Sequence, residues 1–351
     1  MGKILVTGGC GYIGSHTIVD LVENGYDVIS VDNNSRSNPA IFNGVEKITG
    51  KKVKNYKVDL CNFDDTFAIF QENEKIEGII HFAAYKSVGE SVESPLLYFE
   101  NNLTSLINLL KCAQEFETPF FVFSSSCTVY GNTDKVPVTE DTPPKPAESP
   151  YGYTKQMGEQ IVNEFSKSSG TQSILLRYFN PVGAHPSGLI GEMPIGKPQN
   201  LVPAITQTAI GKLSKMIVHG SDYPTRDGSC IRDYIHVCDI AHAHTLALKY
   251  LQEEKNTGLC EVFNLGTGVG VTVLEAIHAF EKVSGKKLNY VLGPRRPGDI
   301  VAIYANNDLA KKNLGWTPEF SLDEMMETAW KWELKIKHDE ELLTKQDPGL
   351  N

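Results

Sequence analysis

A phenol and an ammonium group lie four residues apart in the segment Tyr151-Gly152-Tyr153-Thr154-Lys155. On a helix, side chains at this spacing lie on one face, one turn apart. Ser149-Pro150, just before the segment, is typical of a helix N-terminus. A free tyrosine titrates near pH ~10, so its pKa must fall by about three, or about 4 kcal/mol, before it can act as a base at neutral pH. A nearby ammonium acts in that direction, so the pair predicts proton transfer by Tyr151 assisted by Lys155.

A run of serines offers a third participant. The segment FSSSCTVYG, at 123–131, follows an apolar run that we expect to be a strand. The carboxyl ends of parallel strands form the edge of the sheet where open α/β folds bind ligands. A serine there could share a hydrogen bond with Tyr151 and a substrate hydroxyl. Taken alone, the run is equally compatible with a strand end made soluble by small polar residues.

Glycines follow the first apolar run of the chain. In Thr7-Gly8-Gly9-Cys10-Gly11-Tyr12-Ile13-Gly14, three glycines recur at a spacing of three, between a predicted strand and a predicted helix. This arrangement is typical of a tight turn whose amides face a pyrophosphate, although a turn with a purely structural role is the alternative. A second predicted strand ends in Asp32, where a carboxylate would bind the adenosine ribose. Since a carboxylate repels a 2′-phosphate, Asp32 favours NAD over NADP. Arg36, which is nearby in the sequence, weakens this preference.

The surrounding elements predict an α/β fold of the Rossmann type. Apolar runs rich in Val, Ile and aromatic residues occur at 3–8, 26–32, 53–60, 77–84, 119–126 and 172–180. Helical patterns separate most of them, and are clearest at 105–116 and 151–165. Alternation of this kind predicts a doubly wound parallel sheet covered on both faces.

The amino-acid composition changes after Asn180, because residues 181–200 are rich in Gly and Pro. We place a domain boundary there, with a dinucleotide-binding domain over 1–180, to which about 233–266 also contributes, and a smaller α/β substrate-binding domain over 181–351. In the second half we expect helices near 200–213, 238–252 and 272–284 and from about 321, a strand at 260–266, and a frayed tail over the last dozen residues.

Several longer segments carry a family resemblance. TGGCGYIGSH, Asp32-Asn33, HFAAYKSVGES, SSSCTVYG, YGYTK, RYFNPVGAHPSG, RDYIHVCDIA and RRPGD occur in this order over nearly the whole chain. Together they resemble the UDP-glucose 4-epimerase family of the extended short-chain dehydrogenase/reductases. The resemblance implies reversible inversion at C4 of UDP-galactose and UDP-glucose through a transient 4-keto sugar. It also implies a tightly bound NAD that takes up a hydride and returns it to the opposite face, so that the cofactor is not consumed.

The resemblance also implies roles for individual residues. Tyr151 would be the base and acid at the sugar 4-hydroxyl, Lys155 would bind the nicotinamide ribose and lower the pKa of Tyr151, and Ser126 would assist proton transfer. The implied cofactor-binding residues are Gly8, Gly11, Tyr12, Ile13, Gly14, Asp32, Asn33, Asp59, Leu60, Phe82, Ala83, Lys86, Asn101, Tyr151, Lys155 and Tyr178. The implied substrate-binding residues are Ser126, Tyr151, Asn180, Asn200, Leu201, His219, Arg232, Arg296, Asp299 and Ile303.

Two positions depart from the bacterial pattern of this family. Ile303 stands where that pattern has a bulky Tyr, and a smaller residue there is associated with N-acetylated sugars. A bifunctional enzyme that also acts on UDP-N-acetylglucosamine and UDP-N-acetylgalactosamine is therefore an open alternative. His219 occupies the place of an aromatic residue near uracil, and an imidazole can still stack there.

Three rival functions share parts of this pattern. A nucleotide-sugar 4,6-dehydratase begins with the same oxidation but needs a further acid and base, which that family carries as Asp-Glu where this chain has Cys127-Thr128. A reductase would release its cofactor in each turnover and show a net redox change. A non-catalytic nucleotide-binding protein could keep the same fold, because a fold alone does not determine function.

Charge and composition limit the partners. The 351 residues carry a formal net charge of −10, with 41% hydrophobic and 22% charged residues. Such a chain is poorly suited to nucleic acid or an anionic membrane, so a polyanionic ligand must meet a local cluster of cations. The two arginines Arg232 and Arg296 would supply it for a UDP-hexose substrate. From the resemblance we also expect a homodimer formed through helices near 100–116 and 151–168.

The cysteines and histidines suggest no metal. Seven Cys without a CxxC pair are typical of buried thiols in a reducing compartment, and with no basic-apolar leader in sight we expect a cytoplasmic protein. The segment HVCDIAHAH brings His236, Asp239, His242 and His244 close in sequence, but their spacing yields no compact set of three ligands. Cys127 is better explained as a buried thiol than as a nucleophile.

Overall fold

The structure is a computed structural model that describes residues 2–346 apart from 74, 134, 195, 197, 297 and 298, with the backbone alone over 340–346. Pro297 and Gly298 of the RRPGD segment therefore lie outside the described residues.

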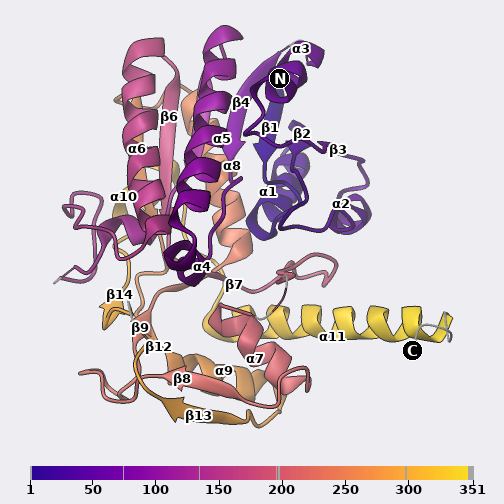
Figure 1. Cartoon of the computed structure of the whole chain (residues 1–351), viewed down its shortest axis with the longest axis vertical. Helices are drawn as coiled ribbons and strands as arrows, with labels where there is room; N and C mark the ends of the chain where they lie inside the picture. The colour runs from indigo at the N-terminus through magenta and orange to yellow at the C-terminus, as the bar shows by residue number, and fades with distance from the viewer. Residues whose placement is uncertain are drawn as a thin grey trace.

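A parallel sheet forms the larger part of the molecule (Figure 1). Within the described residues it has seven strands in the order β11-β6-β5-β4-β1-β2-β3, all paired in parallel. Their bounds are β1 Lys3–Thr7, β2 Asp27–Val31, β3 Lys54–Tyr56, β4 Ile76–His81, β5 Phe120–Ser124, β6 Gln172–Tyr178 and β11 Cys260–Leu265. The chain order reverses between β1 and β4, and ligands of doubly wound sheets bind beside such a reversal, at the carboxyl ends of the strands. The predicted fold class is confirmed.

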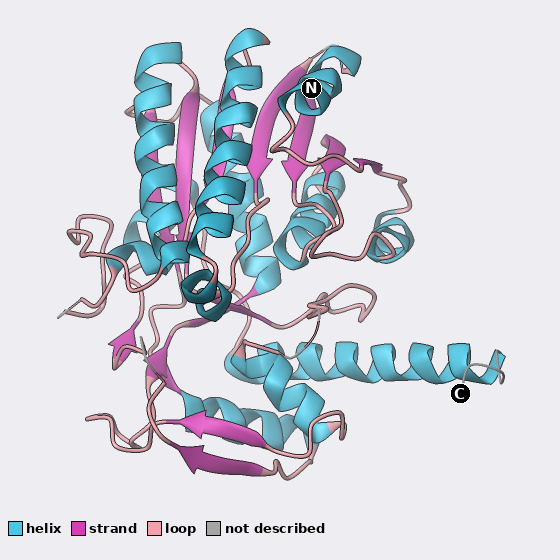
Figure 2. Ribbon diagram, in the orientation of Figure 1, coloured by secondary structure: helices cyan, strands magenta, loops and turns pink. Residues whose placement is uncertain are grey.

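Helices cover both faces of this sheet (Figure 2). One face packs against α1 (Tyr12–Glu23), α2 (Ile41–Thr49) and α8 (Val237–Gln252) through a continuous apolar core. The other packs against α3 (Phe63–Glu72), α5 (Pro95–Glu115) and α6 (Pro150–Ser169) through a second core. Strands buried on both faces read as nearly continuous apolar runs, which explains why the sequence pattern located them.

The smaller part of the molecule has a separate core. It is formed by the helices α7 (Leu201–Ala209), α9 (Val273–Ser284) and α11 (Leu322–Gln346) and by the parallel pair β8 (Met216–His219) and β13 (Tyr290–Gly293). Further short strands pair among themselves in two separate small sheets: β7 Asn180–Val182 with β10 Tyr234–His236, and β9 Ile231–Arg232 with β12 Val271–Thr272 and β14 Ala302–Ile303. Of the last dozen residues, which were expected to fray, 340–346 are helical and 347–351 lie outside the described residues. Helix α11 projects beyond the rest of the fold in Figure 1.

Later segments of the chain return to the large sheet. Helix α8 lies on the same face as α1, and β11 pairs with β6. Helix α10 (Asp308–Leu314) also joins this core through Ala310 and Leu314, which was not expected from the sequence. The remaining short elements are α4 (Val88–Glu93) and the 3₁₀ turn η1 (Cys127–Tyr130).

Candidate active site

The glycine-rich turn between β1 and α1 needs glycine at two positions. Gly8 has a φ of +69°, a conformation that other residues rarely adopt. A Cβ atom on Gly14 would lie 2.3 Å from the carbonyl oxygen of Gly8, so the helix could not pack so closely on the turn. The Cys10 amide donates to Asp32 Oδ2 at 3.1 Å, which ties this turn to the end of β2.

A cavity of about 460 Å³ lies beside this turn. All of the predicted cofactor-binding residues line it, together with four of the predicted substrate residues: Tyr151, which is on both lists, Ser126, Asn180 and Asn200. They come from the ends of β1 to β6 and from α1, α5 and α6, segments that are distant in sequence. The topology thus brings the predicted dinucleotide turn and the predicted catalytic residues to one cavity.

Helix α6 carries Tyr151 and Lys155 into this cavity. The Ser149 hydroxyl accepts a hydrogen bond from the Gly152 amide at 3.1 Å and caps the helix, and Pro150 occupies its first turn, as predicted. Both reactive side chains are buried. Lys155 Nζ donates to the carbonyl oxygen of Ser124 at 2.6 Å, so the helix is tied to the end of β5, where Ser126 also lies.

The electrostatics of Tyr151 differ from the expectation. Burial raises the pKa of its phenol far above the usual value, and the neighbouring Tyr178 acts in the same direction. Contact with the Ser126 hydroxyl opposes this rise. The predicted lowering of the Tyr151 pKa is therefore not a property of the folded chain itself, because desolvation of a phenolate outweighs what its protein neighbours provide.

Burial also lowers the pKa of Lys155, to about 8, while the negative charge of Glu159 acts in the opposite direction. The ammonium form therefore still predominates at pH 7. Glu159 stands one turn further along α6 and accepts hydrogen bonds from Ser125 Oγ at 2.5 Å and Arg177 Nε at 2.8 Å. This half-buried carboxylate connects α6 to the end of β5 and to β6.

The other predicted substrate residues form a separate group. Asp299 Oδ1 lies 3.0 Å from Arg296 Nη2 and 3.5 Å from Arg232 Nη2, so one carboxylate is shared by two guanidinium groups. Ile303 pairs with Arg232 between β14 and β9 and is buried in an apolar cluster with Phe179. Six of the predicted substrate residues are not among the described residues that line the cavity: Leu201, His219, Arg232, Arg296, Asp299 and Ile303.

This group nevertheless lies close to the cavity. The charge of Arg232 opposes the rise that burial causes in the pKa of Cys127, which lines the cavity beside Ser126. Leu201 begins α7, directly after the cavity residue Asn200. His219 lies further away, exposed at the end of β8.

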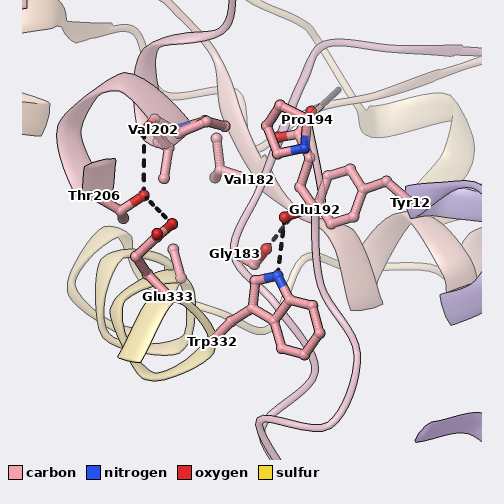
Figure 3. Close-up of a pocket in the computed structure, with 11 residues that line it drawn as sticks. Tyr12, Val182, Gly183, Glu192, Pro194, Val202, Thr206, Trp332 and Glu333 are labelled. Carbon is pink, nitrogen blue, oxygen red and sulfur yellow. Dashed lines mark hydrogen bonds between the residues drawn. The ribbon is translucent and has the colours of Figure 1, made fainter. Parts of the chain in front are cut away.

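A second, small cavity marks the seam between the two parts of the molecule (Figure 3). Tyr12 of α1 donates from its hydroxyl to the Gly183 carbonyl at 2.6 Å, and Trp332 Nε1 of α11 donates to the Glu192 carbonyl at 2.9 Å. Val202 and Thr206 of α7 complete its wall. These contacts hold segment 183–192 between α1 and α11, so Glu192 is placed at the edge of the larger cavity.

Comparison with known proteins agrees with this geometry. A protein-family profile described as GDP-mannose 4,6 dehydratase matches residues 5–329. The UDP-glucose 4-epimerase of Bacillus subtilis is 49% identical over 94% of this chain and 96% of its own, and that of Drosophila melanogaster is 48% identical over 94% and 96%. The chain belongs to the UDP-glucose 4-epimerase family.

Solved structures from this family share the fold. The enzyme from Stenotrophomonas maltophila, crystallised with NAD and formylated UDP-arabinopyranose, is 43% identical and superposes with a TM-score of 0.93, covering 97% of this chain and all of the other. The enzyme from Bifidobacterium longum, in complex with NAD+ and UDP, is 45% identical with a TM-score of 0.91 and covers 95% and 98%.

The dehydratase description of the wider family does not suit the residues at this site. Cys127 and Thr128 occupy the positions where a dehydratase needs its additional acid and base. Burial raises the pKa of Cys127 to about 12, so this thiol cannot exchange protons at neutral pH.

Sequence analysis missed one residue that organises the cavity. Glu192 Oε1 lies 3.2 Å from Lys86 Nζ and 3.0 Å from Asn200 Nδ2, so it holds a predicted cofactor residue and a predicted substrate residue together. Its only signal in the sequence was its position in the Gly- and Pro-rich segment after Asn180.

The histidine-rich segment serves packing and hydrogen bonding. His236 stacks on Phe320 with ring centroids 3.8 Å apart, and Asp239 accepts hydrogen bonds from the amides of Glu319 and Phe320. Within the described residues we find no group of three or more His, Cys, Asp or Glu that could hold a metal ion. Among the described helices none is long and apolar enough to cross a membrane.

Proposed function

We propose that this chain reversibly inverts C4 of UDP-galactose and UDP-glucose through a transient 4-keto sugar, with a tightly bound NAD that is not consumed. The observation that carries this proposal is that Tyr151, Lys155 and Ser126 line the same cavity as the glycine-rich turn and Asp32. The names of the relatives and the ligands of their structures support it.

The residues present fit a dinucleotide. Gly8 and Gly14 let β1 turn closely into α1, so that the amides at the start of the helix could face a pyrophosphate. Asp32 at the end of β2 suits the adenosine ribose, with Asp59 and Leu60 beside adenine. The cavity volume lies within the range of about 300–1,000 Å³ usual for small-molecule sites. When bound, NAD would accept a hydride from C4 of the sugar and return it.

The side chains of this chain would carry the proton. Tyr151 would remove the proton of the 4-hydroxyl as the ketone forms, and return it as the ketone is reduced. Because burial disfavours a phenolate at Tyr151, a neighbouring positive charge is needed to stabilise it. Lys155 is suited to that role because its ammonium form predominates at pH 7. Ser126 would donate a hydrogen bond to the same oxygen of the sugar.

The smaller domain, 181–351 apart from the returning segment at about 233–266, would hold the UDP portion. Arg232 and Arg296 would neutralise the pyrophosphate, in exchange for their shared contact with Asp299. Asn180, Asn200, Leu201 and His219 would bind the hexose and the uridine. Ile303 would influence the size of the hexose accepted. The UDP-Glc/GlcNAc 4-epimerase from Campylobacter jejuni is 34% identical and superposes with a TM-score of 0.82, so activity on N-acetylated sugars is the alternative to be tested.

We further propose that two copies associate through α5 and α6. Ile107 of α5 and Tyr153 and Met157 of α6 are apolar side chains with more than a third of their surface exposed, on two helices that pack side by side. A second copy with the same face would cover them symmetrically. Sedimentation of the wild type and of Met157→Glu would test this, with a dimer expected for the first and a monomer for the second. A wild type that sediments as a monomer would contradict it.

The proposed activity is tested by a product assay without added reductant. UDP-galactose should be converted to UDP-glucose with no net absorbance change at 340 nm, and UDP-N-acetylgalactosamine is assayed in parallel. A product lighter by one water would indicate a dehydratase, and a steady change at 340 nm a reductase. Absence of any product from either sugar would favour a non-catalytic nucleotide-binding protein.

A further inference from the structure

A loop after β2 surrounds the carboxylate of Asp32. The Asn34 amide donates to Asp32 Oδ1 at 2.9 Å, and Ser37 Oγ donates to the same oxygen at 2.8 Å. Arg36 lies between these two contacts and lines the cavity. Its guanidinium therefore belongs to the end of the cavity proposed to bind the adenosine ribose.

This guanidinium is held by a carboxylate from a different segment. Arg36 Nη2 donates to Glu90 Oε1 at 2.6 Å, and its guanidinium carbon lies 4.7 Å from the centroid of the Tyr85 ring. Glu90 belongs to α4, which follows β4, so the contact joins the loops at the ends of two different strands of the sheet.

Glu90 is itself fixed in place. Its second oxygen, Oε2, accepts a hydrogen bond from the hydroxyl of Tyr98 at 2.7 Å. Tyr98 is completely buried, and its oxygen also accepts from the Ser87 amide at 3.1 Å. Both carboxylate oxygens thus have defined donors, and the pair with Arg36 is part of a supported arrangement rather than a chance contact between mobile side chains.

The pairing keeps both groups charged. The hydrogen bond from Arg36, and then that from Tyr98, lower the pKa of Glu90 below its usual value. The hydrogen bond to Glu90 in turn raises the pKa of Arg36. Since both side chains are partly exposed, the pair adds little to stability. Its main consequence is that the positive charge beside Asp32 is neutralised.

Among the described residues that line the cavity, each positively charged side chain has a hydrogen-bond acceptor or a carboxylate partner within the protein. Three such residues are described there: Arg36 pairs with Glu90, Lys86 with Glu192 at 3.2 Å, and Lys155 with the Ser124 carbonyl at 2.6 Å. Of these, only Arg36 lies in the loop around Asp32. A 2′-phosphate on the adenosine ribose would therefore meet the carboxylate of Asp32 and a guanidinium already engaged by Glu90.

We propose that Glu90 is a specificity-determining residue that makes the site select NAD over NADP, by withholding Arg36 from a 2′-phosphate. The inference rests on the proposed use of a dinucleotide cofactor in this cavity. It also explains how Asp32, which favours NAD, and Arg36, which weakens that preference, can occur together in one site. Arg36 does not favour NADP, because its charge is committed to Glu90.

A competition between the two cofactors tests this inference. The purified holoenzyme and its variants are incubated with equal concentrations of NAD+ and NADP+ until the bound fraction no longer changes, then desalted and denatured. The released nucleotides are quantified by mass spectrometry. The variants are Glu90→Gln, Arg36→Ala and the double variant, with Glu90→Ala as a second removal of the charge should the glutamine variant fail to fold.

We expect the wild type to retain NAD, and Glu90→Gln to raise the bound ratio of NADP to NAD at least tenfold. Arg36→Ala should leave the ratio close to that of the wild type, since its guanidinium is already withheld. In the double variant the gain should disappear, because no free cation is created.

Other outcomes would overturn the inference. The ratio could stay unchanged in Glu90→Gln, or rise equally in the double variant. Arg36→Ala alone could lower the ratio tenfold, which would mean that Arg36 already serves a 2′-phosphate. Equal loss of both cofactors from Glu90→Gln would mean that the pair merely closes the cavity. A wild type that retains neither cofactor would instead contradict the proposed function itself, and the inference with it.

Discussion

The ammonium group of Lys155 donates a hydrogen bond of 2.6 Å to the carbonyl oxygen of Ser124, the last residue of β5. This contact joins the helix that carries Tyr151 to the strand end that carries Ser126, so the three proposed catalytic residues are held by two rigid elements. It also leaves a positive charge in a buried site beside a phenol whose ionisation burial disfavours. The predictions below follow from this arrangement.

Tyr151→Phe should reduce turnover by about 10²–10⁴-fold or more, because general acid–base catalysis typically contributes that much. The cofactor should remain bound, because the phenyl ring still fills the same buried position. Conversion of UDP-galactose and NAD content are measured on the same preparation. Tyr153→Phe is the matched control, since Tyr153 lies on the same helix but is not among the residues that line the cavity. Full activity in Tyr151→Phe would remove Tyr151 from the mechanism.

Glu159→Gln should shift the alkaline limb of the pH–rate profile to lower pH. The pKa of Lys155 is about 8, and the charge of Glu159 raises it, so removing that charge lowers the pH at which the ammonium loses its proton. Glutamine keeps an oxygen that can accept from Ser125 and Arg177. The profile of kcat/KM between pH 6 and 10 measures the shift. A limb that stays in place or moves upward would show that Lys155 does not need its positive charge.

Arg232→Ala should raise the KM for UDP-galactose at least tenfold, which corresponds to about 1.4 kcal/mol of lost binding. The reason is the loss of a cation proposed to face the pyrophosphate. Arg226→Ala is the control, because Arg226 pairs with Glu275 on the surface of the smaller domain. If both variants changed KM equally, the effect would be one of overall charge. An unfolding midpoint measured alongside separates binding from folding, since Arg232 also donates to the Ile300 carbonyl.

The unfolding free energy should fall on acidification, in part because of His244. Burial lowers the pKa of this side chain from 6.5 to about 4 in the folded protein. Between these values the unfolded chain binds a proton that the folded chain excludes, so stability decreases as the pH falls, by up to about 1.4 kcal/mol per pH unit from this group. His244→Gln should flatten the dependence by that amount in urea unfolding at pH 7, 6 and 5. An unfolding free energy that depends on pH equally in His244→Gln and in the wild type would contradict the prediction.

The sequence predicted those parts of the fold and site that depend on local patterns. The strands of the large sheet were visible as apolar runs because burial on both faces requires them. The glycine-rich turn, Asp32 and the pair Tyr151 and Lys155 were visible because their spacing along the chain determines their spacing in space. The end of α11 was misjudged, since the helix continues to Gln346 where a frayed tail was expected.

Contacts between distant segments could not be predicted in this way. Glu192 and Lys86 are 106 residues apart, and Arg36 and Glu90 are 54 apart, with no periodicity to connect them. The rise that burial causes in the pKa of Tyr151 could not be predicted either, because it depends on how deeply the assembled fold buries the phenol. Arg36 is instructive, since its type weakened the preference for NAD that Asp32 indicated, and its contact with Glu90 could not be seen in the sequence.

The central claim, that C4 is oxidised and reduced by a hydride that never leaves the site, is tested most directly with UDP-galactose carrying deuterium at C4. The enzyme is supplied with this sugar in ordinary water and the UDP-glucose formed is analysed by mass spectrometry and NMR. We predict that the deuterium is retained at C4 of the product, while no hydrogen from the solvent enters the carbon skeleton. Replacement of the deuterium by solvent hydrogen at C4 would contradict the account.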